Sequence, residues 1–128
     1  GRTGRMLERM DTRERITNAT LRERKRAGRK ISVLTCYDAP TARLMEAAGV
    51  EVLLVGDTAG EVVLGLHSTR EVPVDYMLTI TAAVRRGAPN AYVMADLPYA
   101  CRLNGDATAV RWAQRFMDDT GCDGVKVG

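Results

Sequence analysis

The chain has 128 residues, of which 45% are hydrophobic and 27% are charged, so its length and composition are those of one soluble globular domain. No apolar run approaches the roughly 18 residues of a membrane-spanning helix, and the N-terminus carries no secretory signal. The three cysteines are widely spaced and form no CxxC pair, which favours reduced thiols over a disulfide framework or a zinc site. We therefore expect a cytoplasmic protein without a membrane partner.

The N-terminal segment is strongly basic although the net charge is only +3. Residues 1–30 contain 11 Lys and Arg against 4 Asp and Glu, whereas residues 31–128 contain 8 against 12. Such a segment could contact nucleic acid or an anionic surface. It has no aromatic residue to stack on a base, and acidic residues are interspersed in it. We therefore expect no nucleic-acid partner and a basic, disordered tail over residues 1–15.

Helices and strands alternate in the predicted order of elements. A first helix is expected from Thr17 or Asn18, either of which could cap it, to about Ala27, and Gly28 is its stop signal. Apolar runs with strand composition predict strands over residues 31–35, 50–55, 91–95 and 124–127. Helical spacing of apolar residues predicts helices over residues 41–48, 75–86 and 107–119. A connection rich in Gly and Thr is expected over residues 61–74.

The same spacing predicts which side chains face the core. The helix over residues 41–48 is expected to bury Leu44, Ala47 and Ala48. The helix over residues 107–119 is expected to bury Val110, Ala113, Phe116 and Met117.

Alternation of strands and helices indicates an α/β fold with a parallel sheet that is covered on both faces. Right-handed crossovers fit either a doubly wound sheet or a (β/α)8 barrel. An eight-stranded barrel needs about 250 residues, and this chain reaches only a fourth strand. Because natural domains usually end at the surface, an end on an apolar strand predicts a truncated sequence. Half a barrel would leave two open strand edges, which invite association.

Two acidic residues follow successive predicted strands. Asp57 closes the run Val52–Asp57, and Asp96 closes the run Ala91–Asp96. The carboxyl ends of parallel strands are where α/β folds place their chemistry. Each acid alone could equally be a helix cap or a turn residue. Together they predict a site for a divalent cation, because Mg²⁺ is usually held by one or two carboxylates plus substrate and water.

Four further residues are expected near this site. Lys126 lies within an apolar strand, where a lysine needs a polar pocket or a partner such as Asp57, Asp96 or an anionic substrate. A structural ion pair inside the sheet is the alternative role for it. The Thr58 hydroxyl could bind a substrate oxygen, and Tyr37 and Asp38 follow the first strand and are expected to line the same edge.

Several motifs, in order along the chain, resemble those of the ketopantoate hydroxymethyltransferase family. The first-strand motif is matched by Thr35–Ala42, and the second by Leu54–Thr58 with the loop segments Val62–Gly65 and Ser68–Thr69. The third is matched by Arg86–Ala88 and Ala95–Tyr99, and the fourth by Val125–Val127. The similarity runs from about Thr20 to the last residue and corresponds to the N-terminal half of the family's barrel.

The resemblance implies a fold and a reaction. Residues 16–128 would be the first four βα units of a (β/α)8 TIM barrel, preceded by an N-terminal helix. The family transfers a hydroxymethyl group from 5,10-methylenetetrahydrofolate to 3-methyl-2-oxobutanoate, giving 2-dehydropantoate in pantothenate biosynthesis. It uses Mg²⁺ and enolate chemistry, and the full-length family forms homo-oligomers. The implied partners are therefore an α-keto acid, a folate and further copies of the chain.

The resemblance also assigns roles to single residues. Asp57 and Asp96 match acids that bind the metal and contact the substrate. Thr58 stands where the family usually has a substrate-contacting serine, and Lys126 matches the lysine that holds the substrate carboxylate. Gly128 occupies the position of a glutamate that helps to hold the metal. The family's general base, another glutamate, lies beyond this chain, so no catalytic residue is assigned and the chain alone is expected to be inactive.

Two alternatives remain open. One is another Mg²⁺-dependent barrel enzyme acting on α-keto acids, of the isocitrate lyase or phosphoenolpyruvate mutase type, although the cysteine-containing loop motif usual there is absent from this sequence. The other is an inactive fragment or interaction module, which the abrupt end and Gly128 favour.

Overall fold

A computed structural model describes residues 14–128, so most of the predicted basic tail, residues 1–13, lies outside the described residues. The elements in chain order are α2 (Asn18–Arg26), β1 (Val33–Thr35), α3 (Ala39–Ala47), β2 (Val52–Val55), α4 (Ala59–Val62), η1 (Thr69–Glu71), α5 (Val74–Gly87), β3 (Tyr92–Asp96), η2 (Tyr99–Arg102), α6 (Asp106–Thr120) and β4 (Gly124–Lys126). The boundaries of the predicted strands and long helices are confirmed to within two residues. Across residues 14–128, no helix is long and apolar enough to cross a membrane.

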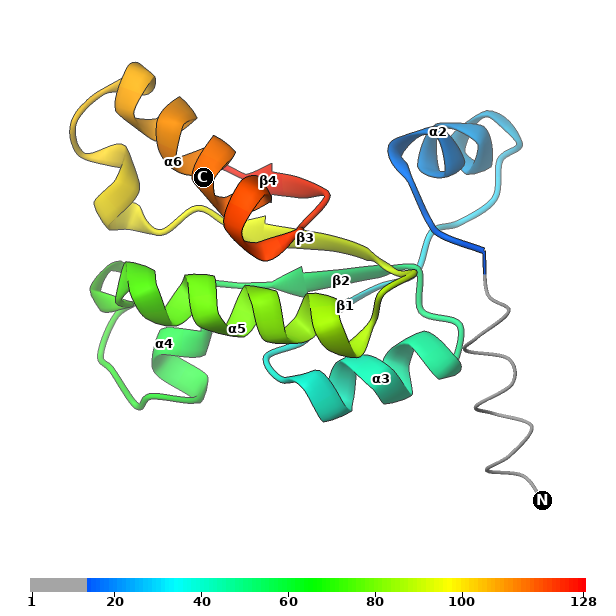
Figure 1. Ribbon diagram of the computed structural model, residues 1–128, viewed down its shortest axis with the longest axis horizontal. Helices are drawn as coiled ribbons and strands as arrows, with labels where there is room; N and C mark the ends of the chain where they lie inside the picture. Colours follow the sequence, from blue (N-terminus) through cyan, green and yellow to red (C-terminus); the bar gives the residue numbers. More distant parts are fainter. Residues whose placement is uncertain (1–13) are drawn as a thin grey trace.

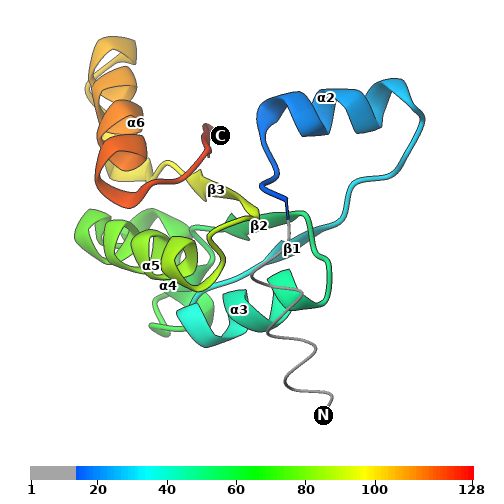
Figure 2. The ribbon, with the colours of Figure 1, turned by 45° about the vertical axis from the view of Figure 1, so that its right-hand side comes forward.

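The sheet has four parallel strands in the order β1-β2-β3-β4, so each strand pairs with its neighbour in sequence. A doubly wound sheet reverses its strand order next to the first strand, whereas a barrel adds strands in sequence. The helices α3, α5 and α6 form an arc outside the curved sheet (Figure 2), and α5 packs against both other helices and against β2 and β3. This arrangement is that of consecutive βα units of a barrel, with three complete units and the strand of a fourth.

The main core lies between the sheet and these helices. Alternate strand residues point into it, namely Leu53, Val55, Val93 and Ala95, and all four are fully buried. They meet buried side chains of α5 and α6, namely Met77, Ile80, Val84 and Phe116. Burial of one such aliphatic or aromatic side chain contributes about 1.5–3 kcal/mol. This packing holds the strands in the register that fixes the relative positions of their carboxyl ends.

The other face of the sheet is covered only near the start of the strands. There a smaller cluster of Ile16, Val52 and Tyr92 packs with Leu21 of α2. Thr17 caps α2 by accepting a hydrogen bond from Thr20 N, so the predicted helix start is confirmed. Figure 1 shows α2 at the end of the sheet where the strands begin, opposite the end where α4 and η2 lie. The carboxyl ends of the strands are therefore free of α2.

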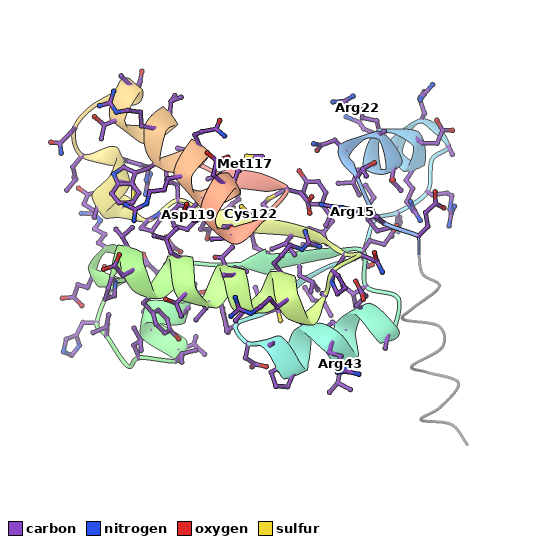
Figure 3. The ribbon with its side chains drawn as sticks, in the orientation of Figure 1. Arg15, Arg22, Arg43, Met117, Asp119 and Cys122 are labelled. Atoms are coloured by element: carbon purple, nitrogen blue, oxygen red, sulfur yellow. The ribbon has the colours of Figure 1, made fainter. Side chains whose placement is uncertain are left out.

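The predicted inward faces of two helices are partly wrong. In α3, Leu44 is 59% exposed, and the buried residues are instead Ala42 and Glu46. In α6, Phe116 is buried as predicted, but Val110 is 67% exposed and Met117, labelled in Figure 3, is also exposed. Each helix is rotated about its own axis, so that it buries a different face from the one that the spacing of its apolar residues predicts.

A buried carboxylate explains the rotation of α3. Glu46 Oε1 accepts hydrogen bonds from the backbone N–H groups of Asn90 and Ala91, at 2.6 and 2.7 Å. These N–H groups lie just before β3 and need partners because buried backbone donors are rarely left unpaired. The side chain of Glu46 therefore anchors α3 to the start of β3, a role that a hydrophobic pattern does not predict.

The expectation that all strands are covered on both faces is also wrong. The three residues of β1 are exposed, and Val33 is 52% exposed. β1 is an edge strand, paired only with β2 within the described residues, and neither hydrophobic cluster includes a residue of β1.

Candidate functional site

Three predicted site residues meet at the carboxyl edge of the sheet. Asp57 lies two residues after the end of β2, Asp96 is the last residue of β3, and Lys126 is the last residue of β4. Asp96 and Lys126 are partners in the β3–β4 register. The short elements α4 and η2 lie at this same edge (Figure 1). Parallel pairing in sequence order is what brings the three residues together.

Asp96 is the centre of this site. Its Oδ1 accepts a hydrogen bond of 2.9 Å from Lys126 Nζ, and its Oδ2 accepts one of 3.0 Å from the backbone N–H of Asp57. The side chain of Asp96 is only 10% exposed, whereas that of Lys126 is 55% exposed. Lys126 therefore has the carboxylate partner predicted for it, and its ammonium group still faces the open edge of the sheet.

The two aspartates influence each other electrostatically. Burial raises the pKa of the Asp57 carboxyl, and the neighbouring Asp96 carboxylate raises it further, while the positive charges of Lys126 and Arg102 act in the opposite direction. The hydrogen bond to Asp96 raises the pKa of Lys126. Two carboxylates that repel each other in this way form a favourable environment for an added cation.

Thr58 is held by Tyr37. The hydroxyl oxygen of Tyr37 lies 2.6 Å from Thr58 Oγ1, so the first βα unit supports a residue of the second. Gly56 makes room for this arrangement, because a Cβ there would lie 3.1 Å from Thr58 Oγ1 and 3.5 Å from Asp96 Oδ2. Asp38 has a different role: its Oδ1 accepts a hydrogen bond of 2.7 Å from Thr41 N and caps α3.

The donor set fits a hard cation that is only partly coordinated by protein. Within residues 14–128, no group of three or more His, Cys, Asp or Glu side chains could hold a metal ion. Asp57 and Asp96 together still supply the number of protein ligands that is usual for Mg²⁺. This ion takes one or two carboxylates from the protein and completes its coordination shell with substrate and water. They remain the two residues that could hold such an ion.

Three residues near the site were missed by sequence reasoning. Arg70 of η1 and Arg102 of η2 both lie over the ring of Tyr99, with Cζ at 4.9 and 5.6 Å from the ring centroid. No motif or spacing marks the two arginines, and Tyr99 belongs to the matched segment Ala95–Tyr99 but had no predicted role. The proximity of the three residues depends on how two irregular connections fold at the same edge of the sheet.

The fold and the site together define a class: a TIM-barrel α/β protein with acids and a lysine at the carboxyl ends of consecutive strands. A solved structure of 2,3-dimethylmalate lyase, described as a member of the PEP mutase/isocitrate lyase superfamily, has this fold with a TM-score of 0.64. The match has 18% sequence identity and covers 85% of this chain and 39% of that one. At this identity the likeness concerns the fold alone.

The family model of ketopantoate hydroxymethyltransferase matches residues 15–128. The chain belongs to this family. It is 45% identical over 111 residues to the 3-methyl-2-oxobutanoate hydroxymethyltransferase of Shouchella clausii, and 48% identical over 103 residues to that of Desulfotalea psychrophila. These matches cover 87% and 80% of this chain. The chain spans about 40% of the length of the curated relatives it matches.

Proposed function

We propose that this chain forms the 2-oxo-acid-binding part of a hydroxymethyltransferase that converts 3-methyl-2-oxobutanoate to 2-dehydropantoate. The supporting observation is the group of Asp57, Asp96 and Lys126 at the carboxyl edge of the sheet, in a chain of the ketopantoate hydroxymethyltransferase family. The one-carbon donor is 5,10-methylenetetrahydrofolate, and the complete protein acts as a homo-oligomer.

The side chains present have distinct tasks in binding the 2-oxo acid. Lys126 Nζ uses one of its three N–H groups for Asp96 and offers the others to the substrate carboxylate. Asp96 holds the ammonium group in place through its short hydrogen bond. The Thr58 hydroxyl, oriented by Tyr37, donates to or accepts from a substrate oxygen.

Asp57 and Asp96 would hold Mg²⁺. When bound, Mg²⁺ supplies a Lewis acid that polarises the keto group and makes the C3 proton more acidic. The positive charge of Lys126 adds to this effect, because it lies where the anionic substrate becomes more negative. No described residue is assigned as the base that removes the C3 proton, so we propose that the chain alone does not complete the transfer.

A graft tests this function. Residues 15–128 would replace the matching segment of the Shouchella clausii relative, which shares 45% identity with it. We expect the folded chimera to form 2-dehydropantoate from 3-methyl-2-oxobutanoate, the folate donor and Mg²⁺, as detected by mass spectrometry. The ungrafted 128-residue chain should form none. A chimera with a native-like circular dichroism spectrum and no product would contradict the proposal.

The same assay distinguishes the transferase from a second candidate function. The second candidate is a carbon–carbon lyase or mutase that acts on an α-keto acid, and its support is limited to the fold shared with 2,3-dimethylmalate lyase. Such an activity would convert its substrate without consuming the folate donor. Product that appears in the absence of the donor would favour that candidate over the transferase.

A further inference from the structure

Two arginines and a tyrosine form a stack beside the acid–lysine site. Arg70 comes from η1, which follows β2, and Arg102 and Tyr99 come from η2, which follows β3. Both guanidinium groups lie over the Tyr99 ring, at 4.9 and 5.6 Å from its centroid. The two positive charges therefore cannot be farther apart than the sum of these two distances. We refer to Arg70, Tyr99 and Arg102 as the arginine–tyrosine stack.

The positive charge of the stack is not neutralised. Within residues 14–128, neither arginine forms a salt bridge with an acidic side chain, although five other arginines and Lys126 do. Arg102 Nη1 donates to the backbone oxygen of Gly128 at 2.7 Å. Arg102 Nε is buried and has no hydrogen-bond partner among the described residues. Two positive charges over one ring, without an acidic side chain to pair with them, favour the binding of an anion.

Arg102 of the stack lies beside the acid–lysine site, because its Nη1 bonds to the oxygen of Gly128, two residues after Lys126. Its positive charge also lowers the pKa of Asp57 and of Lys126, against the stronger effects that raise them. η1 and η2 contact each other, so the stack and the acid–lysine site share one edge of the sheet. A ligand bound on the stack would therefore extend toward Asp57 and Asp96.

We propose that the arginine–tyrosine stack is an oxyanion subsite for the carboxylates of the second substrate. A planar guanidinium binds a carboxylate through two parallel N–H bonds, which an ammonium group cannot match. The Tyr99 ring positions both guanidinium groups through cation–π contacts. The ligand class is an aromatic amide that carries a dicarboxylate. This inference rests on the proposed function, in which the one-carbon donor has that chemistry at the end remote from its methylene group.

Calorimetric titration with p-aminobenzoyl-glutamate tests the proposal directly. We expect saturable binding that weakens with added salt, because exposed charge–charge attraction is screened. Arg102→Gln and Arg70→Gln should each weaken binding at least about tenfold, the loss expected for one charge-assisted hydrogen bond. Arg43→Gln is the matched control, because Arg43 is an exposed arginine of α3 (Figure 3) and should leave binding unchanged.

Further titrations identify the type of anion that binds and the hydrogen-bond geometry that it needs. Inorganic phosphate should bind more weakly than p-aminobenzoyl-glutamate; equal or tighter binding of phosphate would overturn the assignment to a dicarboxylate. Arg102→Lys should recover only part of the affinity, because it keeps the charge but loses the planar pair of donors. Arg70 is exposed, so Arg70→Gln keeps the test valid even where an Arg102 variant does not fold.

Titration with 3-methyl-2-oxobutanoate and Mg²⁺ separates this inference from the proposed function. Normal binding of the 2-oxo acid, with no binding of p-aminobenzoyl-glutamate or with binding unaffected by the Arg70 and Arg102 variants, overturns the subsite alone. Binding of p-aminobenzoyl-glutamate that the variants abolish, with no binding of the 2-oxo acid, supports the subsite and contradicts the proposed function.

Discussion

Lys126 Nζ and Asp96 Oδ1 lie 2.9 Å apart across two paired strands, so that a half-exposed cation is fixed by a buried carboxylate. This pair joins the third and fourth βα units, and the bond from Asp57 N to Asp96 joins the second and third. The site therefore depends on the register of the sheet more than on any single loop.

Replacement of Lys126 should separate binding from stability. Lys126→Met is expected to weaken the binding of 3-methyl-2-oxobutanoate by roughly 10- to 100-fold, because one hydrogen bond between charged groups is lost. The free energy of unfolding should change by only about 1 kcal/mol or less, since the lysine side chain is half exposed. Calorimetry and urea denaturation measure the two effects, with Lys30→Met as the exposed control. An equal loss of 2-oxo acid binding in Lys126→Met and in Lys30→Met would exclude a specific role for Lys126.

Removal of one carboxylate charge at a time should weaken metal binding. Asp57→Asn and Asp96→Asn each remove one of the two anionic ligands available at this edge, so Mn²⁺ or Mg²⁺ titration should show weaker binding in both variants than in the unmodified chain. Asp38→Asn is the control, because Asp38 caps α3 and should not bind the ion. Indistinguishable titration curves for all the proteins would remove the metal-site proposal.

Tyr37 and Thr58 should act as a coupled pair. Tyr37→Phe and Thr58→Val are each expected to weaken binding of the 2-oxo acid, and the double variant should lose less than the sum of the two. A coupling energy of about 1 kcal/mol is the value expected for one hydrogen bond. Thr58→Ser keeps the hydroxyl and should bind as the original chain does. Strict additivity would show that Tyr37 does not orient Thr58.

Glu46 should be important for stability. Glu46→Ala removes the acceptor of one buried and one partly buried backbone N–H group and is expected to lower the free energy of unfolding by about 2–4 kcal/mol, as judged from the cost of leaving such donors unpaired. Urea denaturation measures the loss, and Glu61→Ala, at an exposed position of α4, should be close to neutral. A loss of less than about 0.5 kcal/mol for Glu46→Ala would contradict the anchoring role, since surface changes reach that size.

Sequence reasoning was effective where a local rule fixes a position. Apolar runs and glycine stop signals defined the strands and helices, and the rule that chemistry follows parallel strands predicted the positions of Asp57 and Asp96 at the carboxyl edge of the sheet. The lysine inside an apolar strand indicated a buried partner, and the structure identifies it as Asp96.

The remaining features depend on contacts between distant segments. Glu46 lies on the inward face of α3, whereas an acidic residue is normally assigned to the solvent face. The arginine–tyrosine stack joins two connections that have no periodic pattern. The rotation of α6, which leaves Val110 exposed, follows from its packing on α5 and β4 rather than from its own sequence.

Asp57, Asp96 and Lys126 are proposed to bind a 2-oxo acid together with Mg²⁺, and calorimetric titration of 3-methyl-2-oxobutanoate decides whether they do. The prediction is saturable binding that is stronger with Mg²⁺ than without it and is lost in Asp96→Asn. Binding that is equal with and without Mg²⁺, or that survives in Asp96→Asn, would contradict it.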